Sequence, residues 1–195
     1  MKRLQEQMDF IIEVDKLKNI MRQNYLADGS RKESDTDHSW HLAIMCFLLE
    51  EYANEEVDIL KVMKMVLIHD IVEIDAGDTY AYDREANKDK RKRELEAADR
   101  IFNLLPQDQA VKMRSLWDEF EESKTAEAKF ANTLDKVQPA ILNHVSGGQS
   151  WREHKVEYSQ ILERNAKTSE GSEVLWEYVK AFLNENVENR NIINK

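Results

Sequence analysis

Residues that interrupt regular structure are scarce in this sequence. The 195 residues include five glycines and two prolines, the two residue types that most often end helices and strands. Charged residues make up 34% of the chain and hydrophobic residues 42%, a composition that favours amphipathic helices in a soluble protein. No segment has convincing strand alternation, and no internal repeat is evident. We therefore expect an all-α fold, a compact helical bundle that forms a single domain over residues 1–195.

Apolar residues recur at helical spacing along most of the chain. The expected helices cover residues 2–21, 39–53, 58–74, 84–105, 108–122, 125–145, 151–165 and 172–186. Residues 22–37 contain Gly, Ser, Asn and Asp and are predicted to form an extended loop. Asp35 or one of the two residues after it is available to cap the second helix. Pro139 lies inside the sixth expected helix, where its missing N–H predicts either a plain break or a deliberately irregular backbone near Asp135.

Charge and cysteine usage restrict the classes of function. The net charge of −10 argues against general nucleic-acid binding, which requires a basic surface. A small anionic substrate is compatible with it, because a bound divalent cation would supply local positive charge. The basic run KDKRKRE at 88–94 is flanked by acidic residues, so we interpret it as a solvated helix face.

Cys46 lies in an apolar run and has no partner for an intrachain disulfide. It is expected to be a core residue in a reducing compartment. The sequence has no apolar run long enough to cross a membrane and no signal-peptide pattern at its start. These features together predict a cytoplasmic protein without a membrane partner.

The run HDIVEIDAGD, residues 69–78, places an imidazole and four carboxylates at the end of an expected apolar helix. Carboxylates in such a place destabilise a fold unless their charge is compensated. A metal ion is the obvious compensator, because it binds imidazole nitrogen and carboxylate oxygen together. Glu73 follows His69 by four residues, so on a helix the two side chains share a face. Gly77 permits a sharp exit that leaves Asp78 at the start of a loop.

Adjacent residues of a helix diverge, so a His–Asp pair needs further ligands from other helices. His38 and His41 lie three residues apart, and each could be a ligand or have a capping or core role. His144 and His154 flank the SGGQS loop without a matching carboxylate pattern, which predicts surface or loop positions. Asp135 has apolar neighbours at helical spacing, so it is either buried beside a metal or paired with a neighbouring lysine.

The order His38, then His69 with Asp70, then Asp135 resembles the H…HD…D signature of the HD-domain phosphohydrolase superfamily. More closely, the chain resembles the 5′-deoxynucleotidase branch of that superfamily. The matching segments are MRQNY (21–25), ESDTDHSWHLA (33–43), HDIVEIDAGD (69–78), LLPQD (104–108), LWDEFEE (116–122) and AEAKFANTLDKVQ (126–138). The likeness covers residues 16–142 and fades after Gly148.

The resemblance implies one divalent metal ion (Mn, Co, Mg, Zn or Fe), and it favours His38 over His41 as a ligand. The implied ligands are His38, His69, Asp70 and Asp135. It also implies that Glu73 and Asp78 act beside the metal, in proton transfer and in positioning the attacking water. Arg22 matches the arginine on the phosphate side, and Tyr25 stands where the family commonly has Trp beside the nucleoside sugar.

The activity implied by the resemblance is that of a metal-dependent phosphomonoesterase, which releases phosphate from deoxyribonucleoside 5′-monophosphates. The expected partner is a small nucleotide rather than a nucleic-acid polymer, and the expected assembly is a homodimer. One alternative keeps the site but changes the substrate to an alarmone, a cyclic nucleotide or a nucleoside triphosphate. A second alternative is a non-catalytic helical binding protein whose metal is structural or absent.

Overall fold

A computed structural model describes residues 1–83 and 85–195, which form a helical protein with one small β-hairpin. The α-helices are α1 (Lys2–Val14), α2 (Asp35–Leu49), α3 (Ile59–Ile68), α4 (Glu73–Ala76), α5 (Lys90–Phe102), α6 (Gln107–Glu122), α7 (Ala126–Val145), α8 (Gln149–Glu153), α9 (Tyr158–Arg164) and α10 (Glu173–Glu188). Short 3-10 helices cover Asp15–Asn19, Glu50–Tyr52 and Thr168–Glu170, and the strands are β1 (Met21–Tyr25) and β2 (Lys32–Ser34). The predicted all-α fold class is confirmed.

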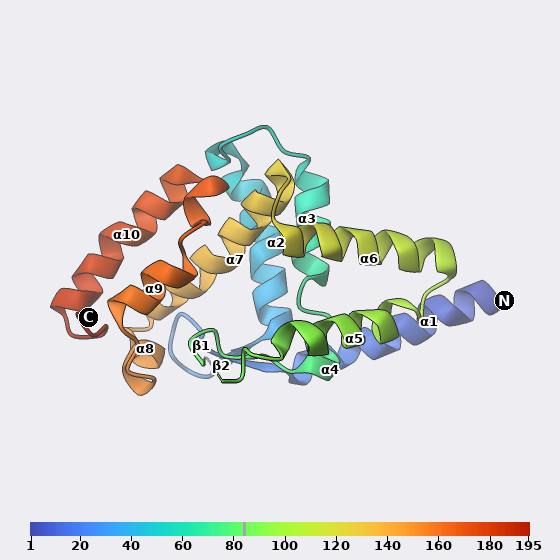
Figure 1. The fold of residues 1–195 in the computed structure, drawn as a ribbon, viewed down its shortest axis with the longest axis horizontal. Helices are drawn as coiled ribbons and strands as arrows, with labels where there is room; N and C mark the ends of the chain where they lie inside the picture. The colour runs from blue at the N-terminus through green and yellow to red at the C-terminus, as the bar shows by residue number, and fades with distance from the viewer. Residues whose placement is uncertain (84) are drawn as a thin grey trace.

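Helix α7 runs through the middle of the molecule (Figure 1). Helices α2 and α3 pack against each other, and both pack against α7. Helix α10 also packs on α7, while α5 and α6 extend towards the end where the N-terminus lies (Figure 1). Three long helices from distant parts of the sequence therefore meet at α7.

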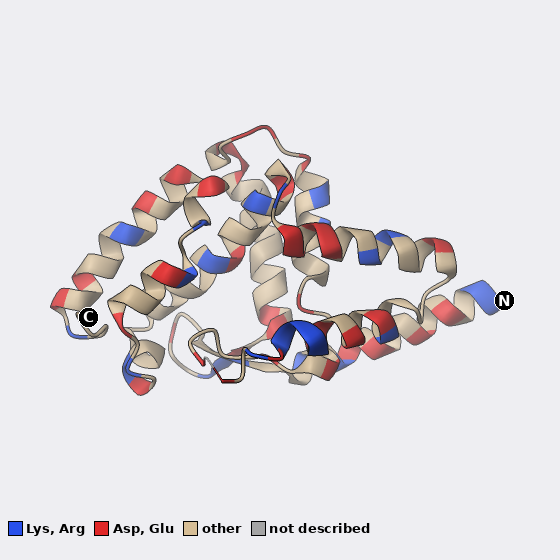
Figure 2. Ribbon diagram, in the orientation of Figure 1, with Lys and Arg blue, Asp and Glu red and all other residues tan. Residues whose placement is uncertain are grey.

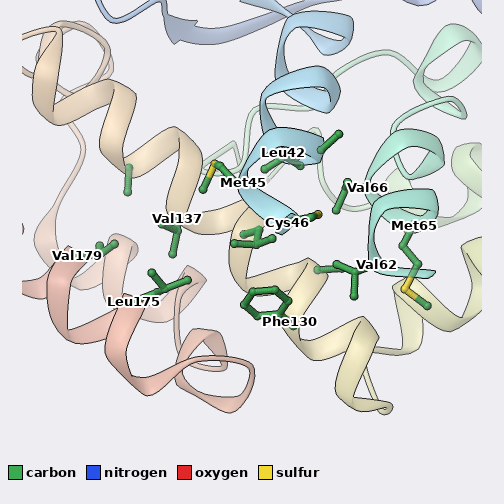
Figure 3. Packing of buried hydrophobic residues seen from close by; sticks show 14 of the residues in the cluster. Leu42, Met45, Cys46, Val62, Met65, Val66, Phe130, Val137, Leu175 and Val179 are labelled. Atoms are coloured by element: carbon green, nitrogen blue, oxygen red, sulfur yellow. The ribbon is translucent and has the colours of Figure 1, made fainter. Parts of the chain in front are cut away.

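Two clusters of buried side chains hold these helices together. The larger lies among α2, α3, α7 and α10 and includes Leu42, Cys46, Val66 and Phe130 (Figure 3). The smaller joins α1, α5 and α6, with Trp117 at its centre. Cys46 is a buried free thiol, as its apolar surroundings predicted. Among the described residues, no helix has the length and apolar character needed to cross a membrane.

Helices α6 and α7 lie within one residue of their predicted bounds. Thr125 caps α7, because its hydroxyl accepts a hydrogen bond from the Ala128 N–H. Helix α7 continues past Pro139 to its end, so the predicted plain break is wrong. The Pro139 carbonyl accepts a hydrogen bond from the side chain of Asn24 on β1.

The predicted extended loop at 22–37 is wrong, because most of this segment forms an antiparallel hairpin. Met21 lies opposite Ser34 across the two strands, and a positive φ of 70° at Gly29 lets the chain turn between them. Ser34 then starts α2 with a capping box, in which its hydroxyl accepts from the Asp37 N–H and its own N–H donates to the Asp37 carboxylate. Helix α2 thus begins four residues earlier than predicted.

Other expected helices are shorter than the sequence indicated. The first ends at Val14 and continues as a 3-10 turn. The helix predicted to begin at Arg84 starts at Lys90, and Arg84 itself lies outside the described residues. The helix predicted over 151–165 is divided between α8 and α9. In each case the amphipathic spacing of the sequence continues through positions where the backbone turns, so the predicted helix is longer than the observed one.

Gly171 fixes how closely the chain before α10 approaches α7. A Cβ atom added there would come well inside van der Waals contact with the Lys129 carbonyl and the Thr133 hydroxyl. We expect Gly171→Ala to destabilise the protein by roughly 1–3 kcal/mol, because backbone of α7 cannot move aside cheaply. Urea unfolding measures the change, with Ser169→Ala as a control that keeps its carbonyl in place. An unchanged unfolding free energy for Gly171→Ala would contradict this close packing.

Candidate active site

Seven of the eight predicted site residues converge where α2, α3 and α7 meet. They come from β1 (Arg22), α2 (His38), the turn after α3 (His69 and Asp70), α4 (Glu73), the loop after α4 (Asp78) and α7 (Asp135). Sequence segments more than 100 residues apart thus meet at one place. The site is therefore a product of the tertiary fold rather than of one local motif.

The predicted helix over 58–74 is interrupted, and the interruption aims the His–Asp pair. Helix α3 ends at Ile68, and the Glu73 N–H bonds to the carbonyl of Asp70 at 2.9 Å. The carbonyl of His69 instead accepts from the indole N–H of buried Trp117 at 3.1 Å. His69 and Glu73 consequently do not share a face of one continuous helix, which corrects the prediction. Gly77 has a φ of 74° and provides the predicted sharp exit.

The two histidines turn their Nε2 atoms towards Asp135. The Nδ1 of His38 donates to the amide oxygen of Gln138 at 2.9 Å, and the Nδ1 of His69 donates to the carbonyl of Val66 at 2.9 Å. In a neutral imidazole each Nε2 then carries a lone pair. The Nε2 of His38 lies 3.0 Å from Asp135 Oδ1, and the Nε2 of His69 lies 3.5 Å from the same oxygen.

Such an arrangement needs positive charge, which either a proton on an imidazole or a metal ion between the groups supplies. The Nε2 of His69 is buried without a hydrogen-bond partner and also lies 3.1 Å from Asp70 Oδ2. One ligand atom each from His38, His69 and Asp135 falls within 4.8 Å of the others. Imidazole nitrogens with carboxylate oxygens are a donor set that fits Zn, Mn, Fe or Co. Asp135 thus faces the histidines rather than a neighbouring lysine.

Arg22 compensates a second group of buried acids. Its guanidinium Nη1 lies 2.7 Å from Asp70 Oδ2 and 3.4 Å from Asp35 Oδ1, and its Nε lies 3.6 Å from Glu33 Oε2. One oxygen each from Asp35, Asp70 and Glu73 also falls within 4.8 Å of the others. Asp35 and Glu33 were missed as site residues, although both belong to the matching segment 33–43. Asp35 was considered only as a helix cap, a role that Ser34 takes.

Burial and neighbouring charge shift the acid–base behaviour of this group. Burial raises the pKa of Glu33 to about 7 and, with the charge of Asp70, raises that of Asp35 to about 8. The pKa of Glu73 is raised well above its usual value by burial and then by Asp70 and Asp35. Burial also raises the pKa of Asp78. The carboxyl groups of Glu73 and Asp78 therefore retain protons more readily than exposed carboxyl groups.

The pKa values of the two histidines shift in opposite directions. Burial, followed by the charge of Arg22, lowers the pKa of His38 to about 4. Burial opposes protonation of His69 as well, but the charges of Asp70 and Asp135 prevail and raise its pKa to about 10. His69 thus attracts positive charge, as a position next to two carboxylates requires.

A cavity of about 110 Å³, partly open to solvent, leads from this group to the surface. Arg22, Asp70, Glu73, Asp78 and Asp135 line its inner part. Tyr25 does not line it, although its neighbours Arg22, Gln23 and Asn24 do, and the Tyr25 hydroxyl donates to Glu153 at 3.0 Å. The structure therefore does not bring Tyr25 to the other predicted residues, and its role beside a sugar stays a prediction.

The interpretation of the basic run 88–94 as a solvated face is partly wrong. The first turn of α5 carries a dense group of basic residues (Figure 2). Arg91 and Lys92 are exposed, as expected. Lys90 lines the cavity, and Arg93 donates to the Thr79 hydroxyl and the Ala86 carbonyl. Lys90 and Arg93 lie three residues apart, so both fall on the inner face of α5. The acidic residues that flank the run in the sequence give no indication of this.

The remaining histidines lie outside the group. His41 accepts a hydrogen bond from the Gln138 amide N–H at 3.1 Å, so it supports the residue that orients His38. His144 is half-buried in α7 and stacks on Phe182 with ring centroids 4.6 Å apart, which corrects its predicted surface position. His154 is exposed and lies over Tyr80 at 4.3 Å.

Comparison with known proteins decides the family. The family model for the HD domain matches residues 14–176. The chain belongs to the HD-domain family. The human protein named 5′-deoxynucleotidase HDDC2 is 30% identical over 132 residues, and the Dictyostelium discoideum protein of that name is 33% identical over 129 residues. The matches cover 67% and 63% of this chain, and 63% and 68% of the two relatives.

One solved structure is similar to this chain over nearly its full length. The crystal structure described as a predicted metal-dependent phosphohydrolase from Magnetospirillum magnetotacticum is 47% identical and has a TM-score of 0.93. The similarity covers 97% of this chain and 95% of that one. The C-terminal helices of this HD-domain chain are therefore part of a fold seen elsewhere.

The pKa shifts predict how the stability of metal-stripped protein depends on pH. The raised pKa values of Asp35, to about 8, and of His69, to about 10, mean that the folded state binds more protons than the unfolded state above about pH 6.5. The lowered pKa of His38 adds no pH dependence above its ordinary value of 6.5. Stability should therefore fall as pH rises from about 6.5 to about 8.

Thermal unfolding of chelator-treated protein across this pH interval measures the effect. Excess divalent metal should flatten the dependence, because the ion binds the deprotonated ligands. A stability of the metal-stripped protein that rises over the same interval would contradict the assigned shifts.

Proposed function

We propose that this HD-domain protein is a metal-dependent phosphohydrolase that releases phosphate from deoxyribonucleoside 5′-monophosphates. The observation that carries the proposal is the meeting of two imidazole lone pairs with the carboxylates of Asp70 and Asp135 at the inner end of a cavity. The names of the curated relatives, which match this chain over about two thirds of its length, support the substrate class.

In this proposal His38, His69, Asp70 and Asp135 hold one divalent ion, of Mn, Co, Mg, Zn or Fe. The orphaned Nε2 of His69 and the shared approach to Asp135 Oδ1 support this ligand set. When bound, such an ion lowers the pKa of water and draws charge from a phosphoryl group. Two imidazoles and two carboxylates leave coordination positions open, as a catalytic site needs.

Glu73 and Asp78 would move the protons. Burial raises the pKa of both carboxyl groups, so each can hold a proton at a higher pH than an exposed acid. One can then take a proton from the attacking water while the other gives one to the departing 5′ oxygen. Arg22 would present its planar guanidinium to phosphate oxygens, and its bond to Asp70 keeps both side chains in position.

A homodimer in the cytoplasm completes the proposal. Helix α1 leaves Leu4, Met8, Ile11 and Ile12 exposed, with between 44% and 67% of each residue accessible. Apolar residues on one exposed face suit a second copy of the chain. The molar mass in solution tests this part independently of activity.

The activity is tested by measuring phosphate release from a nucleotide panel after metal-stripped protein is reloaded with Mn, Co, Mg or Zn. We expect release from deoxynucleoside 5′-monophosphates and none from the 3′ isomers. Pyrophosphate or triphosphate products would instead indicate another nucleotide substrate. The absence of any hydrolysis product with every metal would indicate a binding protein and overturn the proposal.

Substitution of Asp70 provides the sharper prediction. Asp70→Ala should reduce turnover on the order of a thousandfold or more, because it removes a ligand of the proposed ion. Asp75→Ala is the matched control, since Asp75 lies in the same run but is exposed and pairs with Arg100. Circular dichroism checks that both variants fold. Equal turnover of the Asp70 variant and wild type would remove the metal mechanism.

Gln138 offers a test that does not depend on turnover. Its buried amide oxygen accepts from His38 Nδ1, which orients that ring towards Asp135. Gln138→Met keeps the approximate volume but removes the acceptor, so metal affinity should fall roughly 10–100-fold. Titration of the metal-stripped protein with Mn²⁺ measures the affinity, with Gln107→Met at the exposed first residue of α6 as control. Equal affinities in the two variants would show that Gln138 does not support a ligand.

A further inference from the structure

The cavity contains more positive charge than the family signature accounts for. Besides Arg22, its lining includes Lys90, Lys136 and Arg164, which come from α5, α7 and α9. The four cations lie far apart in the sequence, so no charge run predicts their meeting. Arg164 belongs to the segment after Gly148, for which the sequence suggested no role.

These cations differ in how fully they are neutralised. Arg22 is surrounded by Glu33, Asp35 and Asp70. Lys90 forms an ion pair with Glu94, one helical turn away at 3.3 Å. For the guanidinium of Arg164, the structure shows no hydrogen bond or ion pair with any residue in the ranges 1–83 and 85–195. Arg164 is exposed and lines the cavity.

Lys90 and Arg164 also affect the pKa of the same neighbouring side chain. The charges of Lys90 and Arg164 both oppose the rise in the pKa of Asp78 that burial causes. Arg164 disfavours the charged form of Lys90, whose pKa is nonetheless raised by Glu94 and Glu73 against burial. Lys90 and Arg164 therefore lie close enough to repel each other across the cavity, beside the proposed proton-transfer residue. Like charges held together in this way favour an anion between them.

A phosphate group fits that position better than a carboxylate side chain. Lysine supplies a compact charge and arginine a planar fork of donors, and both bind phosphate oxygens well. The cavity also has an aromatic side, because Tyr80 and Tyr82 line it with ring centroids 5.3 Å apart. A nucleoside monophosphate combines the two chemistries, an anionic group and a flat ring that can lie against aromatic side chains.

We propose that Lys90 and Arg164 are substrate-binding residues that hold the phosphate of a nucleoside monophosphate in the cavity that Asp70 and Asp135 also line. This inference rests on the proposed function for its substrate, and it makes α9 a wall of the active site. The two cations bind the phosphate in the ground state and in the transition state alike. Removal of either cation should therefore raise KM and leave kcat nearly unchanged.

Arg164→Gln and Lys90→Gln test the proposal in the metal-loaded protein. With dAMP as the probe, each variant should raise KM roughly tenfold, the loss expected for one charge-assisted hydrogen bond, while kcat stays within about threefold. Arg164→Lys keeps the charge and should recover most of the affinity. Lys167→Gln is the matched control: it removes an exposed cation three residues further on that does not line the cavity, and its KM should equal that of wild type.

Calorimetric titration of metal-stripped protein with dAMP gives a readout separate from turnover. Binding should be weaker in Arg164→Gln than in Lys167→Gln. Wild-type turnover with unchanged KM and unchanged dAMP binding in Arg164→Gln overturns this inference and leaves the proposed function standing. A wild type that hydrolyses no nucleotide, but binds dAMP more tightly than Arg164→Gln, overturns the proposed function and supports the cationic wall.

Discussion

The fold depends on compensating a group of buried charges at the crossing of α2, α3 and α7. Asp135 faces two imidazole nitrogens that carry no proton in the neutral rings, and Asp70 lies 3.1 Å from one of them. Arg22 compensates the acids on one side of the group. On the other side only a proton or a metal ion can do so, because buried charges require partners. Core packing brings the helices together. The carboxylates that Arg22 does not compensate then need a cation, and this need makes the crossing of the helices a candidate binding site.

Several local features aim the side chains at that crossing. The indole N–H of Trp117 donates a hydrogen bond to the carbonyl of His69 where α3 ends, and the His–Asp pair lies in a turn rather than along a helix. Gln138 accepts from His38 and donates to Glu33 at 2.6 Å, which fixes the orientation of its amide. The hairpin before α2 delivers Arg22 to the same place. Departures from regular helix thus position Arg22 and the His–Asp pair, whereas His38 and Asp135 project from within α2 and α7.

The sequence predicted most of the long helices and the residues at the crossing. Helices α6 and α7 have clear amphipathic spacing, and Thr125 caps α7. Spacing together with family likeness pointed to His38, His69, Asp70 and Asp135. It did not reveal the hairpin, because strands this short lack alternation. It also missed Asp35 and Glu33, whose importance comes from Arg22 across the fold. Arg164 carries no signal at all in the sequence, because only the tertiary structure brings α9 to the cavity.

The central claim is that one cation sits among the four ligands. A crystal structure of the metal-loaded protein, with anomalous scattering recorded at the absorption edge of the metal, tests it most directly. The account predicts a single strong anomalous peak roughly 2.0–2.3 Å from the Nε2 atoms of His38 and His69 and from oxygens of Asp70 and Asp135. A fully loaded crystal with no peak there, or with Asp135 turned away from the ion, would contradict it.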